Sequence, residues 1–386
     1  MKIGIPKEIV PEESRVAAVP ETVAKMIKAG WEVVVESGAG ARSYIEDQDY
    51  EKVGAKIAAS PEMLFDQAEI VLKVQRPLFN DKKSLHELDL MKANSILLAP
   101  LFPTRHPELL AKLNAKKITS FSLDMVPRIA RAQSMDILSS MSNIAGYKSV
   151  IMAANYLGKL FPMMTTAAGT ILPAKIIVIG AGVAGLQAIA TARRLGGVVL
   201  AFDTRPIAEE QVQSLGAEFV CLQTSHAEAQ DAGGYAKEQS ADFYQQEQAV
   251  IQQHLKEADV VISTALIPGK PAPLLITAEM VKTMKQGAVI VDLAVEQGGN
   301  CALTKPGEII IKHGVTLIGV LNVPGTLPIH ASQLYSRNLF AFLNHINPQR
   351  HVNEWDFTDE IIKSCLITHQ GETVHPSVQQ VKLPAG

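Results

Sequence analysis

The strongest constraint on this chain is a Gly-x-Gly-x-x-Gly motif that stands between a strand pattern and a helix pattern. The apolar run Ile176–Ile179 precedes the glycines, and the helix-forming stretch Val183–Leu195 follows them. A second apolar run, Val198–Phe202, then ends at an acid, Asp203. Strand, glycine turn, helix, strand and acid in this order are the pattern of a dinucleotide-binding βαβ unit. The motif therefore predicts a Rossmann-type fold for the middle of the chain.

Each glycine of the motif has its own expected role. Gly180 permits a tight turn, Gly182 lets the backbone approach a pyrophosphate, and Gly185 lets the helix pack close to the sheet. The N–H groups and positive dipole end of the helix favour the phosphates. Asp203 can accept hydrogen bonds from a ribose diol and repel a 2′-phosphate, which predicts NAD(H) rather than NADP(H). Arg205 complicates this preference, because an arginine can accommodate the extra phosphate.

Length and composition limit the class of protein. The 386 residues are too many for one ordinary core and suit two domains. A net charge of −3 gives no strong basic field for nucleic acid. The three scattered cysteines form no Cys-x-x-Cys pair, so reduced thiols and no metal site are expected. The sequence shows neither a signal-peptide pattern nor a membrane-spanning run, and we expect a cytoplasmic chain.

Strand and helix patterns alternate in both halves of the chain, as in parallel sheets with crossover helices. The sequence therefore predicts an α/β protein with two Rossmann-like, doubly wound domains joined by long helices. One domain, without a glycine fingerprint, comprises residues 1–138 plus 327–386. The other comprises residues 139–326 and binds NAD(H). A tract rich in Leu, Phe and Ala, Leu327–Ile346, is expected to form a helix that returns to the first domain.

Residues 224–248 interrupt the pattern of the second domain with a polar segment that contains Gly233, Gly234 and Tyr235. A long loop in a compact domain is either disordered or a lid. The glycines supply hinge freedom, and Tyr235 can pack on a bound nucleotide. The residues alone leave a mobile lid and a solvated surface excursion equally open.

A second polar constellation precedes a long helical stretch, Ser134–Leu160. Gln133, Asp136 and a serine (Ser139 or Ser140) fall on one helix face, and the Gln133 amide can hold a nicotinamide carboxamide. The alternative is ordinary helix capping by Ser134. The local pattern alone favours capping.

Several blocks of sequence resemble the NAD(H)-binding subunits of proton-translocating NAD(P) transhydrogenases. They are Pro-Arg-Ile-Ala-Arg-Ala-Gln-Ser-Met-Asp, Ala-Gly-Val-Ala-Gly-Leu-Gln-Ala, Gly-Gly-Tyr-Ala-Lys and Val-Asp-Leu-Ala-Val-Glu-Gln-Gly-Gly. The resemblance implies that the nicotinamide end is lined by Arg128, Gln133, Asp136 and Ser139. It implies that Tyr235 lies on a loop closing over the nucleotide, and that Asp203 binds the adenosine ribose. It further implies that the surrounding pocket contains Val183, Thr204, Arg205, Gly234, Ala265 and Leu266.

The resemblance also implies a division of labour between chains. Only one glycine fingerprint is present here, so NADP(H) is expected on a partner subunit, with proton translocation through membrane-spanning subunits. The chain is then a homodimeric component of an oxidoreductase and translocase. We expect it in the cytoplasm, attached to the inner membrane through its partners.

The main alternative is an amino-acid dehydrogenase similar to alanine dehydrogenase, whose substrate-binding arginine and lysine match Arg15 and Lys73. Two other matches fail. Leu101-Phe102-Pro103 stands where the dehydrogenase has a catalytic histidine, with His106 too far along, and Glu296 stands in place of an aspartate.

Oxidising an amino acid requires groups that move protons. Transfer of a hydride between two nicotinamides requires mainly positioning, and the missing groups favour that reaction. A third possibility is a catalytically silent NAD sensor. Whether Arg15 and Lys73 still bind a small molecule stays open at this point.

Overall fold

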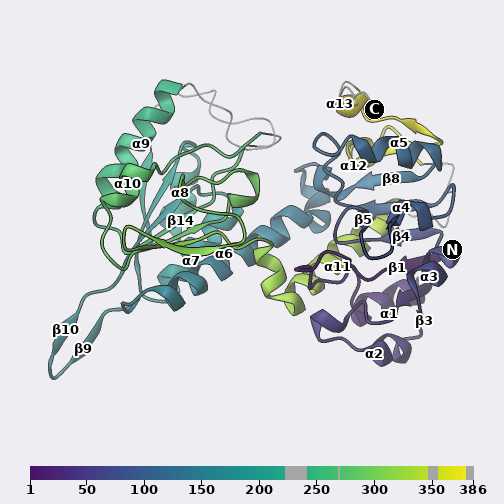
Figure 1. Cartoon of the computed structure of the whole chain (residues 1–386), viewed down its shortest axis with the longest axis horizontal. Coiled ribbons are helices and arrows are strands. Elements are labelled where there is room, and N and C mark those ends of the chain that lie inside the picture. The colour runs from purple at the N-terminus through teal and green to yellow at the C-terminus, as the bar shows by residue number, and fades with distance from the viewer. Residues whose placement is uncertain (222–240, 268–269, 347–354, 380–386) are drawn as a thin grey trace. The chain divides into compact units, whose positions relative to one another are not determined.

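A computed structural model describes residues 1–221, 241–267, 270–346 and 355–379 of the chain (Figure 1). It divides into two compact units. Unit 1 comprises Met1–Met141 and Gly325–Gly386, and unit 2 comprises Ser142–Pro324. Each unit has its own sheet, so each is described by itself.

Unit 1 is built on a mainly parallel sheet with the strand order β19-β18-β8-β7-β4-β1-β2-β3. The strands are β1 (Lys2–Ile5), β2 (Glu32–Glu36), β3 (Lys56–Ala58), β4 (Ile70–Leu72), β7 (Ile96–Ala99), β8 (Thr119–Ser122), β18 (Leu366–His369) and β19 (Glu372–Thr373). The strands from β8 to β3 in this order are parallel, whereas β18 is antiparallel to β8. A short hairpin, β5 (Phe79–Asn80) with β6 (Leu85–His86), lies outside the sheet.

The helices of unit 1 follow the strand–helix alternation of the sequence. They are α1 (Pro20–Lys28), α2 (Asp47–Lys52), α3 (Pro61–Gln67), α4 (Glu87–Leu90), α5 (Glu108–Ala115), α11 (Pro328–Ile346), α12 (Glu360–Cys365) and α13 (Pro376–Gln379). Short 3₁₀ helices also occur: η1 (Ala41–Ser43), η2 (Leu123–Met125) and η3 (Ala130–Met135). Prolines open α1 and α3, where their missing N–H costs nothing.

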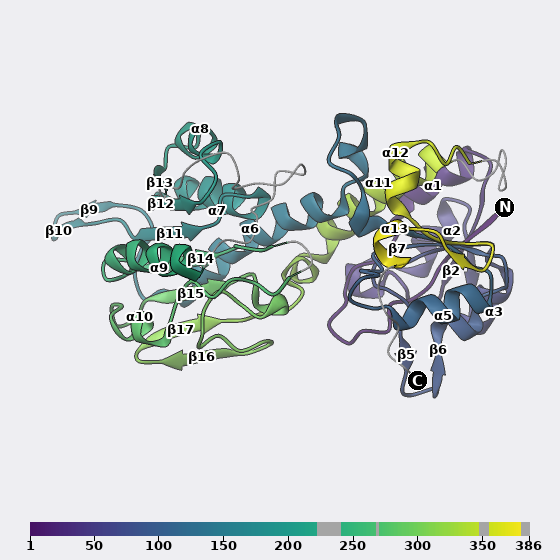
Figure 2. The ribbon, with the colours of Figure 1, turned by 90° about the horizontal axis from the view of Figure 1, so that it is seen from above.

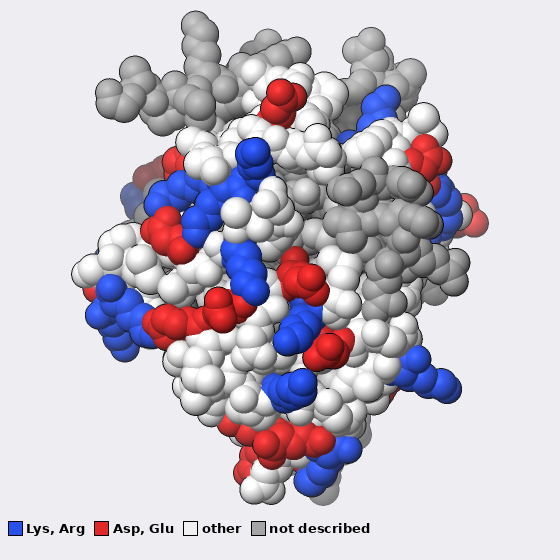
Figure 3. All heavy atoms as spheres, turned by 90° about the vertical axis from the view of Figure 1, so that its right-hand side faces the viewer, with Lys and Arg blue, Asp and Glu red and all other residues white. Residues whose placement is uncertain are grey.

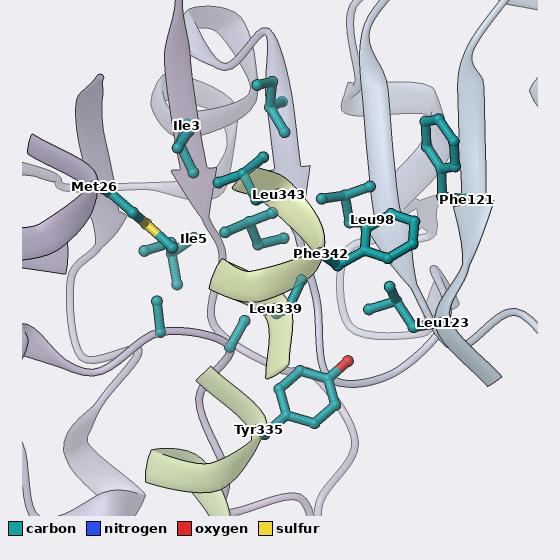
Figure 4. Packing of buried hydrophobic residues seen from close by; sticks show 14 of the residues in the cluster. Ile3, Ile5, Met26, Leu98, Phe121, Leu123, Tyr335, Leu339, Phe342 and Leu343 are labelled. Carbon is teal, nitrogen blue, oxygen red and sulfur yellow. The ribbon is translucent and has the colours of Figure 1, made fainter. Parts of the chain in front are cut away.

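Helix α11 buries one face in the core of unit 1. Leu339, Phe342 and Leu343 are fully buried and pack with side chains of the central strands, including Ile3 and Leu98 (Figure 4). Segments that are distant in sequence are thereby joined into one core, which anchors the C-terminal part of the chain to the N-terminal sheet.

Unit 2 has the strand order β13-β12-β11-β14-β15-β17-β16. Its strands are β11 (Lys175–Ile179), β12 (Val198–Asp203), β13 (Glu218–Cys221), β14 (Val260–Ser263), β15 (Val289–Asp292), β16 (Ile309–Lys312) and β17 (Val315–Ile318). All pair in parallel except β16, which pairs antiparallel with β17. Its helices are α7 (Val183–Arg194), α8 (Ala208–Ser214), α9 (Ala241–Leu255) and α10 (Ala278–Lys282), with the 3₁₀ helix η4 (Val295–Gln297). A further 3₁₀ helix, η5 (Val323–Thr326), falls at the boundary.

Both sheets reverse direction at their first strand, because β1 lies between β2 and β4, and β11 lies between β12 and β14. This is the doubly wound arrangement, and the α/β class predicted from the sequence is confirmed. Ligands of such folds bind at the carboxyl ends of the strands beside the reversal, the topological switch point.

Helix α6 (Ile137–Tyr156) carries the chain from unit 1 into unit 2. It begins at Ile137, three residues later than the predicted helical stretch, because Asp136 caps it. The Asp136 carboxylate accepts the backbone N–H of Ser139 at 2.9 Å and the Ser139 hydroxyl at 2.5 Å. The preceding residues form the separate 3₁₀ helix η3.

The prediction of a loop as far as Gln248 is wrong over its last residues, because helix α9 begins at Ala241. Phe243, Glu247, Ile251 and Leu255 recur every four residues along one face, and all four are buried. The acid in this series and the many glutamines around it concealed the helical pattern. Residues 224–240, with Gly234 and Tyr235, lie outside the described residues.

A hairpin of unit 2 was not predicted from the sequence. Strands β9 (Met164–Thr166) and β10 (Gly169–Ile171) pair antiparallel, and all six residues are exposed. Figures 1 and 2 both show this hairpin extending away from the sheet of unit 2. It leaves large apolar side chains at Met163, Met164, Ile171 and Leu172 in contact with solvent.

The surface of unit 1 shown in Figure 3 carries acidic and basic side chains interspersed. This agrees with the near-neutral net charge of −3. A face of this kind gives no extended basic field for a polyanion.

Candidate functional site

The glycine motif forms the turn between β11 and α7. Gly180 has φ +93°, in the left-handed region, and a Cβ there would lie 2.7 Å from the Thr264 hydroxyl oxygen. A Cβ on Gly185 would lie 1.8 Å from the Gly180 carbonyl oxygen, so only glycine allows α7 to start this close to β11. At Gly182, the N-cap of α7, a Cβ would meet no atom within 4 Å. The turn thus opens toward solvent at a helix N-terminus, a geometry that suits an anion.

Asp203 lies at the carboxyl end of β12, beside this turn, and is buried. Its Oδ2 accepts the Ala181 N–H at 2.7 Å and Arg205 Nη2 at 2.8 Å. Its Oδ1 accepts the Arg205 backbone N–H at 2.9 Å and Arg205 Nε at 2.8 Å. A carboxylate offers about four acceptor positions, so these bonds use its full capacity. The hydrogen bonds to Asp203 raise the pKa of Arg205.

A second acid, Glu247 of α9, is buried in the same unit and was missed by sequence reasoning. Burial raises the pKa of Glu247 to about 7, and the negative charge of Asp203 adds to the effect. Its position within a segment predicted as loop hid it. The four-residue spacing of buried positions along α9 was the signal that could have found it.

The segment after β14 adjoins the glycine turn. The Thr264 hydroxyl donates to the carbonyl oxygens of Ile179 at 3.2 Å and Gly180 at 3.0 Å. Ala265 and Leu266, which the sequence assigns to the pocket, follow directly and are half-buried. Val183 and Thr204 are also half-buried, at the start of α7 and the end of β12.

The nicotinamide residues implied by the resemblance belong to unit 1. Arg128 and Gln133 are exposed, before and within η3, and Asp136 and Ser139 form the cap of α6. The Asn338 side chain of α11 donates to the Ser134 carbonyl oxygen at 2.8 Å and so anchors η3. Of the four residues, hydrogen bonds join Asp136 to Ser139, and the Asp136 N–H donates to the Gln133 carbonyl oxygen at 3.3 Å.

Arg15 and Lys73, the residues matched to alanine dehydrogenase, are occupied by internal ion pairs. Lys73 is fully buried, and its Nζ contacts Glu8 Oε2 at 3.0 Å and Glu87 Oε1 at 2.7 Å. Burial opposes the charge on Lys73, but the two carboxylates outweigh this and raise its pKa. Arg15 donates through Nε and Nη2 to the two oxygens of Glu13, at 2.7 and 2.6 Å. Both cations are neutralised within unit 1.

The positions where alanine dehydrogenase has acid–base groups are also structural here. Asp124 accepts the backbone N–H groups of Leu101 at 2.9 Å and Phe102 at 3.2 Å. Glu296 accepts the backbone N–H of Asn322 at 2.6 Å. Asp124 is partly buried, whereas Glu296 is exposed.

Within the ranges that the structure describes, no three acidic, histidine or cysteine side chains gather as a metal site would require. Over the same ranges, no helix has both the length and the apolar character needed to cross a bilayer.

The chain matches two family models. Residues 4–145 match "Alanine dehydrogenase/PNT, N-terminal domain", and residues 149–376 match "Alanine dehydrogenase/PNT, C-terminal domain". A curated relative from Rhodospirillum rubrum, named as the first portion of an NAD(P) transhydrogenase subunit alpha, is 46% identical over 98% of this chain and 99% of its own length. The alanine dehydrogenase of Methanococcus maripaludis is 33% identical over 85% of this chain and 82% of its own length. The solved transhydrogenase from Sinorhizobium meliloti superposes with a TM-score of 0.83 at 42% identity, covering 98% of this chain and 100% of that one.

Proposed function

This chain belongs to the alanine dehydrogenase/PNT family, and we propose that it is the NAD(H)-binding subunit of an NAD(P) transhydrogenase. In this proposal, hydride passes directly between NAD(H) on this chain and NADP(H) on a partner subunit. Higher identity to the transhydrogenase subunit, 46% against 33% for the alanine dehydrogenase, supports this assignment. It is therefore an oxidoreductase component rather than a free-standing amino-acid dehydrogenase.

The structural observation that carries the proposal is the internal use of the two cations that amino-acid chemistry would need. Lys73 and Arg15 are held by carboxylates of unit 1. The glycine turn, by contrast, presents backbone at the N-terminus of α7. The site is equipped to bind a dinucleotide.

The proposal gives each candidate residue a role toward NAD(H). The open backbone at Gly182 and the N-terminus of α7 suit the pyrophosphate, and Asp203 suits the adenosine ribose. Gln133, with Arg128, Asp136 and Ser139, is assigned to orienting the nicotinamide, and Tyr235 to closing over it. NAD(H) supplies the hydride when bound, and the protein's contribution is orientation, because no proton moves at the reacting carbons.

We also propose that the chain forms a homodimer, and the β9–β10 hairpin supports this. An isolated two-stranded hairpin is marginal in water, and this one exposes Met163 and Leu172 at 62% and 70%. A second copy can cover these side chains. Replacing both with serine should shift the sedimentation mass toward the monomer, whereas Ile311→Ser on β16, also 70% exposed, should not. A variant that stays dimeric removes the hairpin from the interface.

The remaining components of the proposed enzyme lie on other chains. An NADP(H)-binding subunit and membrane-spanning subunits would supply the second nicotinamide and the proton path. The Rhodospirillum rubrum relative, which is named as one portion of a divided subunit, supports a split arrangement. The proposal puts this chain in the cytoplasm, held at the inner membrane by those partners.

Two assays separate the proposed function from its alternatives. Purified chain with pyruvate, ammonia and NADH should show no turnover, whereas an alanine dehydrogenase would turn over quickly. Addition of a separately produced NADP(H)-binding subunit should allow NADH to reduce an NADP⁺ analogue. Turnover of the amino acid by the isolated chain would overturn the proposal, and a silent NAD sensor would be inactive in both assays.

Gln133→Asn tests the positioning role within the same assay. Shortening the side chain should lower hydride transfer about a hundredfold, because an error near 1 Å in the reacting geometry has an effect of that size. NADH affinity should change little. Gln48→Asn, at a glutamine of α2 that is also exposed, serves as the control. Lost affinity with unchanged transfer per bound nucleotide would contradict the assigned role.

A further inference from the structure

Asn300 has no role so far. It is the last residue of the block 292–300, which contains Gly298 and Gly299. It is fully buried, and its backbone is held on both sides. Its N–H donates to Asp292 Oδ2 at 2.9 Å, and its carbonyl oxygen accepts the N–H groups of Leu275 and Ile276, each at 2.9 Å. These bonds hold the Asn300 backbone, and so the origin of its side chain, in one place.

The Asn300 side chain forms hydrogen bonds with both backbone polar groups of Ala265. Its Oδ1 accepts the Ala265 N–H at 3.1 Å, and its Nδ2 donates to the Ala265 carbonyl oxygen at 2.9 Å. The second hydrogen of Nδ2 goes to the Pro273 carbonyl oxygen at 2.8 Å. A carboxamide that pairs the N–H and C=O of one residue fixes the direction of the backbone there.

Ala265 occupies the switch point of unit 2, directly after β14 and beside the glycine turn. The preceding residue, Thr264, donates its hydroxyl to Gly180, and the Ala265 nitrogen would lie 3.3 Å from a Cβ at Gly180. The backbone after β14 is therefore held by the glycine turn on one side and by Asn300 on the other.

The glycines of the block allow Asn300 to reach Ala265. Gly299 has φ +81°, and a Cβ there would lie 2.8 Å from Asp292 Oδ2. Asp292 accepts the N–H of Cys301 at 3.0 Å in addition to that of Asn300. Its other oxygen, Oδ1, accepts the Ser263 hydroxyl and the Ala294 N–H. The chain thus wraps closely around the Asp292 carboxylate and delivers Asn300 to Ala265.

We propose that Asn300 is a positioning residue, which holds the Ala265–Leu266 backbone in the conformation that receives NAD(H). The block from Asp292 to Asn300 then serves nucleotide binding through the backbone of the loop that follows β14. It does not serve acid–base chemistry. This inference rests on the proposed function only in requiring that the chain binds NAD(H).

Asn300→Ser is the first test, with Asp259→Asn as its matched control. Asp259 directly precedes β14, at the end of the strand opposite to Ala265. Its Oδ2 accepts the Lys175 N–H and Lys159 Nζ, each at 2.8 Å. Both variants should unfold at lower temperature. At a temperature where both are folded, titration with NADH should show a Kd about tenfold higher for Asn300→Ser only. Equal NADH affinity in the two variants would overturn the proposal.

Hydrogen exchange of the wild-type chain gives a second test that does not depend on a folded variant. The Ala265 amide should exchange slowly without nucleotide, because Asn300 already holds it, and NADH should change its rate little. Rapid exchange that stops only when NADH is added would overturn the proposal. Failure of the wild type to bind NADH would instead count against the proposed function, whereas a wild type that binds NADH but shows rapid exchange at Ala265 would count against Asn300 alone.

Discussion

The switch points of the two units have the same strand topology, but one holds charged side chains and the other mainly backbone. In unit 1, Glu8 and Lys73 lie just beyond the ends of β1 and β4, and Glu87 joins them. In unit 2, the equivalent ends of β11 and β14 carry Gly180 and Thr264, and the turn presents mainly backbone. The doubly wound sheet creates a favourable position for a ligand twice. The side chains differ, because ion pairs fill the position in unit 1 whereas backbone stays accessible in unit 2, as the proposed NAD(H) site requires.

The charge balance of the two positions differs as well. The buried carboxylates of unit 1 share the ammonium of Lys73, whereas Glu247 in unit 2 is buried near a second acid, Asp203. Unit 1 therefore pairs its buried carboxylates with a buried cation, as a structural element requires. In unit 2, burial and the charge of Asp203 raise the pKa of Glu247, a shift that is typical of functional sites.

The largest effect should come from removing the cation of unit 1. Lys73→Met leaves Glu8 and Glu87 buried without a counter-charge, and should destabilise the fold by about 3–5 kcal/mol in denaturant titrations. Lys52→Met, whose partner Asp49 is at the surface, should change little. Retained stability would mean that water or a ligand can reach Glu8 and Glu87. The switch points of both units would then be accessible to ligands.

A smaller effect concerns Glu247 and pH. Its raised pKa of about 7, against 4.5, means that the folded chain holds this proton more tightly than the unfolded chain. That stabilisation is fully present below pH 4.5 and is lost as the pH rises through 7. Glu247→Gln mimics the protonated side chain, so the stability difference between about pH 5.5 and about pH 8 should shrink by about 2 kcal/mol.

Thermal unfolding across this pH range measures the effect, with the exposed acid of Glu209→Gln as control. An unchanged pH profile in Glu247→Gln would show that unit 2 neutralises its buried acid as unit 1 does.

The smallest of these effects is expected for Gly182→Ala, which tests whether the glycine turn binds the nucleotide. Gly182→Ala meets no neighbouring atom in the free chain, so stability should hardly change. NADH affinity should fall about tenfold, because the added methyl takes space required for close approach of the pyrophosphate. Gly158→Ala, which also meets nothing within 4 Å, is the control. Unchanged affinity by calorimetric titration would remove the turn from the binding site.

Local patterns predicted the elements that depend on neighbouring residues. The start of α7 and, to within one residue, the bounds of β11 and β12 follow from the apolar runs and glycine positions around the motif. Strand β18 was not predicted, because it is short and its partner β8 lies far earlier in the chain. Helix α9 was missed because Glu247 occupies a buried position on its apolar face.

The candidate site shows the same division. The glycines and Asp203 were found because their spacing expresses a βαβ unit. The partners of Lys73 were not found, since Glu8 and Glu87 are 65 and 14 residues away and only the fold brings them together. Asn300 was missed for a similar reason, because its task is to bond a backbone 35 residues earlier.

The saturated carboxylate of Asp203 has a consequence for how a nucleotide arrives. If Asp203 binds the adenosine ribose as proposed, the diol has to exchange with Arg205, which already donates to both oxygens. The measured binding free energy is then the difference between the bonds of Asp203 to the ribose diol and those to Arg205. The affinity is therefore weaker than the contacts of the bound state suggest. An internal competitor of this kind also returns when the nucleotide leaves, which favours rapid release of the spent coenzyme between turnovers.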